Sequence, residues 1–209
     1  MIALCMYIVI SLVDAAETVI RGTKDNQKES NLEDGQVTVF YPLQEDQVGE
    51  IENRGVTMEE HFSFDIGMDD GSVLRIFKNR NKVDLIVLDR YGINNINVSY
   101  GTDPHIAGSA DEIVLEKRYC EEHGISVGDK VKIGEGEYLV TGLGSSVDYD
   151  APYRKLSDTA VDSTVFGTAF VTEEAYNRIK SEKAAGTEEY TYAFVLNDAM
   201  SADDLKQMI

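Results

Sequence analysis

The stretch at residues 111–143 constrains the fold of this 209-residue chain more than any other part of the sequence. It begins with DEIVLE, an alternation of acidic and apolar residues that predicts a short strand entering a core. Residues 117–123 predict a short helix, ended by Gly124 in the left-handed conformation that glycine adopts without strain. A turn at Gly128-Asp129 and two strands joined by residues 134–136 follow. The stretch therefore predicts a small β-unit with one helix against it, and it contains no pattern of catalytic residues.

The residues before this stretch predict strands interrupted by one helix. Residues 36–41, QVTVFY, alternate as a strand, and residues 44–53, QEDQVGEIEN, form an amphipathic helical pattern with acidic residues at its start. Residues 55–67, GVTMEEHFSFDIG, are typical of one strand because their large apolar residues alternate. A hairpin turn is expected at residues 69–71, before a returning strand. The continuous apolar run at residues 83–89 predicts a buried strand.

The residues after the central stretch predict a loop and then a second group of elements. Residues 144–166 are long for a loop, and long loops in compact domains tend to be functional or mobile. The elements expected after it are a strand at 166–172, a helix at 173–185 that Thr172 caps and Gly186 ends, a strand at 189–197, and a helix from Ser201.

The first residues of the chain, MIALCMYIVISLV, carry no charge. A membrane span needs about 20 apolar residues. A signal peptide would carry basic residues ahead of its apolar run, whereas the first basic residue here is Arg21. We therefore expect residues 1–22 to be a membrane-proximal segment with the outer part of a transmembrane helix. The alternative is a buried core helix, which would have to be covered on all sides because it has no polar face.

Charge and cysteine content exclude some classes of function. The formal net charge is -19, which argues against nucleic acid and anionic membranes as partners because clustered lysine and arginine bind both. Such a field attracts cations and basic peptides, although it also simply keeps a protein soluble. Cys5 and Cys120 are too far apart to suggest a metal site. We expect Cys120 to act as a small buried hydrophobic residue.

Candidates for chemistry are weak, and we predict neither an enzyme nor a cofactor. Glu59, Glu60 and His61 could touch a divalent ion, but no second histidine lies at metal-binding spacing, so metal binding there is left open. The sequence has no GxSxG nucleophile motif and no phosphate-binding loop. The alternating carboxylates of VDYDAPYR lack the remaining ligand positions of a calcium loop.

If the chain binds a ligand or partner, we expect the contact in the loop that contains VDYDAPYR. Tyrosine is favoured at interaction surfaces because it is large, rigid and amphipathic. Core packing is the alternative for the aromatic residues near the loop and on the last strand, which include Phe166, Tyr190 and Tyr192. The predicted ligand- or partner-binding residues are Asp148, Tyr149, Asp150, Tyr153 and Arg154.

Several segments in a fixed order resemble a known family. A DEIVL strand and a short helix precede GISVGDKVKIG and EYLVTGL; DYDAP and FVTEEAYNRI follow, within residues 111–179. This series resembles the extracytoplasmic domain of FtsX/MacB-type ABC transporter permeases, and its order and spacing carry the resemblance. The fold implied is α+β: a split α/β sandwich with an inserted small β-barrel-like sub-domain, preceded by the outer part of a transmembrane helix. The α/β sub-domain would comprise residues 36–110 and 187–209, and the inserted sub-domain residues 111–186.

The resemblance also implies a function and a location. The chain would face the extracytoplasmic side of the cell membrane and couple ATPase-driven motion of membrane helices to export or signalling. Its partner would be a cytoplasmic ABC ATPase subunit; a homodimer or second permease, and a cationic peptide or lipid substrate, are left open. One alternative is a stand-alone membrane-tethered binding module for a peptide or cell-wall ligand. Another, a secreted hydrolase with paired carboxylates, would need a deep acidic cleft.

Overall fold

The computed structural model describes residues 18, 20–25, 27–28, 30–79, 92–101, 107–149, 151–155, 157–182 and 184–196. Residues 20–25 are helical. Within the described residues, no helix combines the length and the apolar character that a membrane crossing requires. The predicted apolar helix at residues 1–13, the strand at 83–89 and the helix from Ser201 lie outside them.

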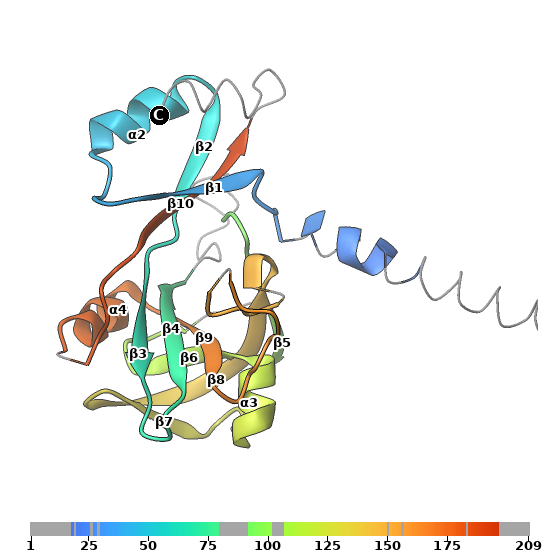
Figure 1. Cartoon of the computed structure of the whole chain (residues 1–209), viewed down its shortest axis with the longest axis vertical. Helices are drawn as coiled ribbons and strands as arrows, with labels where there is room; N and C mark the ends of the chain where they lie inside the picture. Colours follow the sequence, from blue (N-terminus) through green and yellow to red (C-terminus); the bar gives the residue numbers. More distant parts are fainter. Residues whose placement is uncertain are drawn as a thin grey trace, which may run out of the picture.

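The smaller of two sheets pairs the first and last described strands. Strand β1 (Gly35–Val39) lies antiparallel to β10 (Tyr190–Leu196), and β10 pairs on its other side with β2 (Val56–Glu60). Helix α2 (Glu45–Glu52) connects β1 to β2 and lies against this sheet (Figure 1). Both the strand and the helix predicted in residues 36–53 are thus confirmed, although β1 ends at Val39, two residues early.

The larger sheet is curled and contains seven strands of the described chain (Figure 1). Its order is β3-β4-β9-β6-β8-β5, with β7 pairing along part of β8. The pairs β4–β9 and β6–β8 are parallel, and the others are antiparallel. The strands are β3 (Ser63–Gly67), β4 (Val73–Lys78), β5 (Ile96–Gly101), β6 (Glu112–Glu116), β7 (Lys130–Ile133), β8 (Gly136–Ser146) and β9 (Phe166–Val171). The fold is therefore α+β, as predicted, and its strands form two separate sheets.

Helix α3 (Lys117–His123) has the bounds predicted for it. Gly124 closes it in the left-handed conformation, with φ of 64°. The Glu116 carboxylate accepts hydrogen bonds from the backbone N–H groups of Arg118 at 2.9 Å and Tyr119 at 2.6 Å, and so caps the first turn. Tyr119 and Cys120 are buried under the sheet. The predicted burial of Cys120 is confirmed.

The strand predicted at residues 55–67 is two strands in different sheets. The chain leaves the small sheet after β2 and enters the large one at β3. Between them, the Phe62 ring packs edge-on against both Tyr190 and Tyr192, with 5.2 Å between ring centroids in each pair. Val56, Met58, Phe62, Phe64 and Ile66 all stand at even positions, although Glu60 interrupts them and is exposed. This spacing alone could not reveal the change of partner.

The helix predicted at residues 173–185 is shorter than expected. Helix α4 (Glu173–Lys180) begins after Thr172, whose hydroxyl accepts from the Ala175 N–H as predicted, but it ends before Ser181. Gly186 does not terminate it. Gly186 donates its N–H to the Asp65 carbonyl at 2.7 Å, and a Cβ on Gly186 would lie 2.9 Å from that same oxygen. This glycine therefore permits a close approach of two backbones.

The sheets divide the chain differently from the predicted sub-domain ranges. Strands β3, β4 and β5 lie within residues 36–110, yet they belong to the large sheet, in which β4 pairs with β9 and β5 with β8. The predicted boundary at residue 110 thus does not separate the two sheets. The division of the chain into two sub-domains stays a prediction.

Candidate functional site

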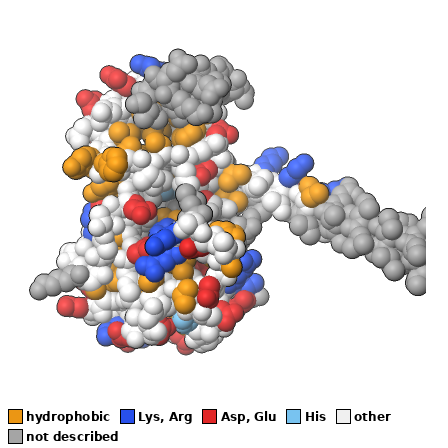
Figure 2. Space-filling view, viewed as in Figure 1, with side chains coloured by type: hydrophobic (Ala, Val, Ile, Leu, Met, Phe, Trp, Pro, Cys, Tyr) orange, Lys and Arg blue, Asp and Glu red, His pale blue; other side chains and the backbone are white. Residues whose placement is uncertain are grey.

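A polar hollow of about 520 Å³ lies between the small sheet and the loop that follows β8. Figure 2 shows lysine and arginine side chains gathered near the middle of one face of this acidic molecule. The hollow contains charges of both signs and takes residues from segments more than a hundred positions apart. Its lining residues are Gln36, Thr38, Arg75, Asp148, Tyr149, Ala151, Tyr153, Arg154, Lys155, Glu189 and Thr191.

Arg75 of β4 connects the loop to the large sheet. Its guanidinium forms a two-point pair with Asp65 of β3, through Nε at 2.8 Å and Nη2 at 3.3 Å. It also donates to the Tyr149 hydroxyl at 3.2 Å and to the Arg154 carbonyl at 3.3 Å. The guanidinium carbon lies 5.2 Å from the centre of the Phe166 ring. Arg75 therefore holds the loop against the large sheet at two positions, Tyr149 and Arg154.

The electrostatics of this group favour a permanently charged Arg75. Burial acts to lower the pKa of Arg75, but the hydrogen bonds to Asp65 and Tyr149 outweigh burial and raise the pKa above its ordinary value. Because Asp65 already neutralises this guanidinium, the charge of Arg75 holds the structure together and is not free to attract a ligand. The cations that face solvent here are Arg154, whose side chain is 47% exposed, and Lys155.

Four of the five predicted binding residues line the hollow. The Asp148 carboxylate lies within hydrogen-bonding distance of the Ser146 hydroxyl, and the Tyr149 ring packs on Phe77 with 5.3 Å between centroids. The Tyr153 side chain is 39% exposed, and Arg154 Nε lies 3.6 Å from Asp65 Oδ2. Asp150 lies outside the described residues. Their role in binding stays a prediction.

The aromatic residues near the loop divide between core and surface. Phe166 and Tyr192 are almost completely buried, at 2% and 1% exposure, so core packing explains both. Tyr149 and Tyr190 are half-buried. Only Tyr153 of this group presents a large part of its ring to solvent.

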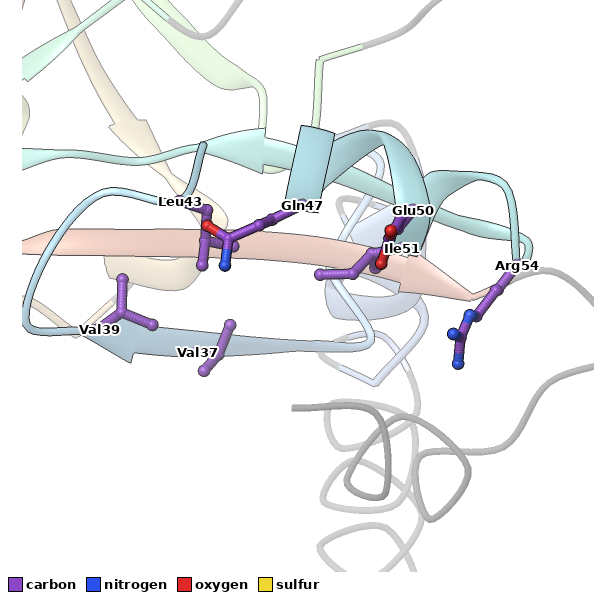
Figure 3. A pocket seen from close by; sticks show the side chains of 7 residues that line it. All are labelled: Val37, Val39, Leu43, Gln47, Glu50, Ile51 and Arg54. Carbon is purple, nitrogen blue, oxygen red and sulfur yellow. The ribbon is translucent and has the colours of Figure 1, made fainter. Parts of the chain in front are cut away.

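A second, smaller concavity of about 190 Å³ lies between β1 and α2 (Figure 3). Val37 and Val39 of β1 point toward Leu43 and α2 across it (Figure 3). Its remaining lining residues are Gln47, Glu50, Ile51 and Arg54. No sequence pattern indicates this apolar concavity, because each of its residues fits an ordinary strand or amphipathic helix.

Two aromatic side chains next to this concavity are unusually exposed. Phe40 is 96% exposed and Tyr41 82% exposed, directly after the end of β1. The sequence pattern predicts both residues inside the strand at 36–41. A large aromatic ring left in water at the end of a strand costs apolar burial, and such residues commonly mark interaction surfaces.

The candidate metal ligands at residues 59–61 hold structural contacts. Glu59 Oε2 accepts the Ile93 N–H at 2.7 Å, and Glu59 Oε1 lies 3.5 Å from His61 Nε2. Across the part of the chain that the structure describes, no three side chains of the metal-binding types converge.

The chain matches no known family and no curated protein. Among solved structures, it is similar to the periplasmic region of MacB from Actinobacillus actinomycetemcomitans, with a TM-score of 0.45 and 9% sequence identity. The alignment covers 90% of this chain and 86% of that one.

Proposed function

We propose that this chain is an extracytoplasmic domain of an ABC transporter permease of the FtsX/MacB kind, with a mechanical and not an enzymatic role. The segments whose order resembles that family fold consecutively as β6, α3, β7, β8, β9 and α4. These elements form one continuous part of the large sheet and its two helices. The series of motifs thus corresponds to a physical unit.

The observation that carries the proposal is the pairing of β1 with β10. Gly35 lies opposite Phe194, so the described chain enters and leaves the small sheet at the same end. Two contacts tie the connections together there: Asp34 N–H donates to the Phe194 carbonyl at 2.9 Å, and Leu196 N–H donates to the Asp34 carboxylate at 2.7 Å. A domain inserted between two membrane helices needs both of its connections on one side, and this arrangement provides that.

Motion of such membrane helices would reach the small sheet first. β1 and β10 would move as a pair. β2 continues into β3 of the large sheet through His61 and Phe62, and the His61 N–H donates to the Thr191 carbonyl of β10 at 2.8 Å. The backbones of Ser63 and Glu189 exchange hydrogen bonds at 3.2 and 2.7 Å across this junction. Because the hollow takes Thr38 and Thr191 from the small sheet and Arg75 from the large one, a tilt between the sheets would change its shape.

In this proposal the domain lies on the outer side of the cell membrane and a cytoplasmic ABC ATPase subunit drives it. The substrate or partner on the outer side would respond to the shape of the hollow. The acidic charge of the chain favours a cationic substrate over an anionic one.

The test starts from the gene. The reading frame beyond residue 209 and its neighbours should encode further hydrophobic spans and an ATPase that co-purifies with the permease. The second test uses the permease in nanodiscs, with its own cysteines replaced and with Thr38→Cys and Tyr153→Cys introduced on the two sides of the hollow. Cross-linking these two cysteines with a bis-maleimide should lower the rate of ATP hydrolysis several-fold. Each single variant treated alike is the control. A frame without further spans, or ATP turnover indifferent to the cross-link, would refute the coupling role.

A further inference from the structure

Strand β1 is an edge strand with no charged residue in it. Among the described strands it pairs only with β10, so one row of its backbone N–H and C=O groups faces away from the sheet. Residues 35–41, GQVTVFY, contain no lysine, glutamate or proline, which are the usual means of preventing a foreign strand from pairing with an edge. In a chain that is 27% charged, this edge is chemically suited to accept another strand.

The two faces beside this edge differ in the way that strand recognition requires. Val37 and Val39 face the apolar concavity against α2, whereas Gln36 and Thr38 face the polar hollow. The alternation follows from the two-residue period of a strand. A strand added along β1 would place every second side chain over the apolar concavity and the others over the polar side.

Phe40 and Tyr41 extend this surface beyond the end of β1. Both rings are more than four-fifths exposed, at 96% and 82%. Exposed aromatic rings beside a pairing edge supply contact area at low entropic cost when a partner covers them. Backbone, apolar concavity and aromatic rings therefore form one continuous surface, which we call the β1 edge (residues 35–41, with Leu43 and Ile51).

The charge around the β1 edge decides what can cover it. Residues 30–54, which contain β1 and α2, carry one basic residue, Arg54 at the rim of the concavity, and six acidic residues: Glu33, Asp34, Glu45, Asp46, Glu50 and Glu52. A second copy of this chain would bring the same six carboxylates against them, in a molecule whose net charge is already -19. A partner segment rich in lysine or arginine would instead be attracted to this surface.

We propose that the β1 edge binds an extended, cationic segment of another protein by strand addition. Its backbone would pair with β1 and its alternate apolar side chains would cover Val37 and Val39. Its basic side chains would lie on the opposite face, beside Gln36 and Thr38, and the acidic residues around the edge would attract the segment by its overall positive charge. This inference goes beyond the permease role. It would hold for a tethered binding module as well, and its failure would leave the coupling proposal unaffected.

The first experiment measures binding of synthetic peptides to the whole chain, kept in a non-ionic detergent and at low salt. The probe is a fluorescently labelled seven-residue peptide in which lysine and valine alternate. Its isomer, with the lysines and valines in two blocks, has the same charge and composition. We expect the alternating peptide to bind at least tenfold more tightly, because only it presents one apolar and one cationic face.

Two further versions of the peptide test the backbone contact. Only alternate backbone amides of the peptide can face β1. In one version the backbone nitrogens of all valines are methylated, and in the other those of all lysines. One version should lose binding and the other should keep it. Amide hydrogen exchange should show new protection at Gly35–Val39 when the parent peptide is bound. Protection confined to the hollow residues would overturn the proposal.

Variants test the side-chain contacts. Phe40→Ala combined with Tyr41→Ala should weaken binding at least fivefold, whereas Val127→Ala, which removes another exposed apolar side chain, should change it less than twofold. Glu45→Gln combined with Glu50→Gln should likewise weaken it, compared with Glu121→Gln on α3.

Three further results would overturn the proposal. Equal binding of the two isomers would mean general attraction to an acidic protein. Protection of β1 that grows with protein concentration in the absence of peptide would identify a second copy as the occupant. Absence of binding at low salt, where attraction between opposite charges is strongest, would remove the site altogether.

Discussion

Replacing Arg75 by methionine should release the loop after β8 and destabilise the protein. Methionine keeps most of the apolar stem but removes the two-point pair with Asp65 and the bonds to Tyr149 and to the Arg154 carbonyl. The Arg75 side chain is 12% exposed and that of Asp65 is 28% exposed, so the lost pair is partly rather than fully buried.

The expected cost follows from this geometry. Removing one partner of a fully buried pair costs about 3–5 kcal/mol because the other charge is left without compensation. Solvent at Asp65, and Arg154 Nε only 3.6 Å from its carboxylate, reduce that cost. We expect the free energy of unfolding to fall by about 2–3 kcal/mol, which corresponds to about 5–10 °C in Tm for a chain of this size. Arg118→Met, an exposed arginine on α3, should change it by less than about 0.5 kcal/mol.

Limited trypsin digestion measures the local effect. Arg154 and Lys155 are cleavage sites within the loop, and Arg75 holds the loop by two hydrogen bonds. Loss of these two bonds should raise the native-state cleavage rate on the order of thirtyfold, since each contributes about 1 kcal/mol against opening.

A double-mutant cycle with Asp65→Asn decides whether the pair itself matters. The double variant should be less destabilised than the sum of the single variants by about 1–2 kcal/mol, because each single change leaves one charge alone. A coupling energy of zero, together with unchanged trypsin cleavage in Arg75→Met, would show that Arg75 neither pairs usefully nor holds the loop.

Three further predictions concern packing, capping and the buried thiol. Gly167→Ala should lower the free energy of unfolding by about 2–3 kcal/mol, because its Cβ would lie 2.6 Å from the Tyr119 ring, whereas Gly49→Ala, with nothing within 4 Å, should raise it by about 0.5 kcal/mol; urea unfolding compares the two. Glu116→Ala should cost about 1–2 kcal/mol in the same assay, since two backbone N–H groups lose their acceptor. Burial raises the pKa of the Cys120 thiol to about 12, so at pH 8, in a chain whose other cysteine is replaced, it should react with a maleimide only at the rate of unfolding; prompt reaction of the native chain would contradict the burial.

Elements set by local signals could be predicted from the sequence. Helix α3 has the predicted bounds because the helix and its Gly124 terminator both depend on adjacent residues. Thr172 was predicted as a cap because threonine is a favoured cap residue, but Glu116 was not, since glutamate seldom occupies that position. The prediction for residues 55–67 was wrong because it depended on which sheet each half would join, and period-two alternation contains no information on partners.

The hollow could be predicted only in part for the same reason. The loop residues were named because a tyrosine- and aspartate-rich segment in a long loop is a local feature. Arg75 lies inside an ordinary apolar strand, and Thr38 and Thr191 are 153 positions apart, yet their hydroxyls lie 2.8 Å from each other. A surface assembled from such distant positions leaves no signal in any one segment, and the β1 edge is of this kind as well.

The pairing of β1 with β10 also determines how the molecule would respond to tension. A pull on both connections acts at one end of an antiparallel pair, so the ladder would unzip bond by bond from Gly35 and Phe194, and not shear all at once. Each bond then bears the force in turn, and a small force suffices. The parallel pairs of the large sheet lie outside this line of tension. The small sheet would therefore yield first and act as a compliant spring, while the hollow's far wall, anchored by Arg75, stays intact.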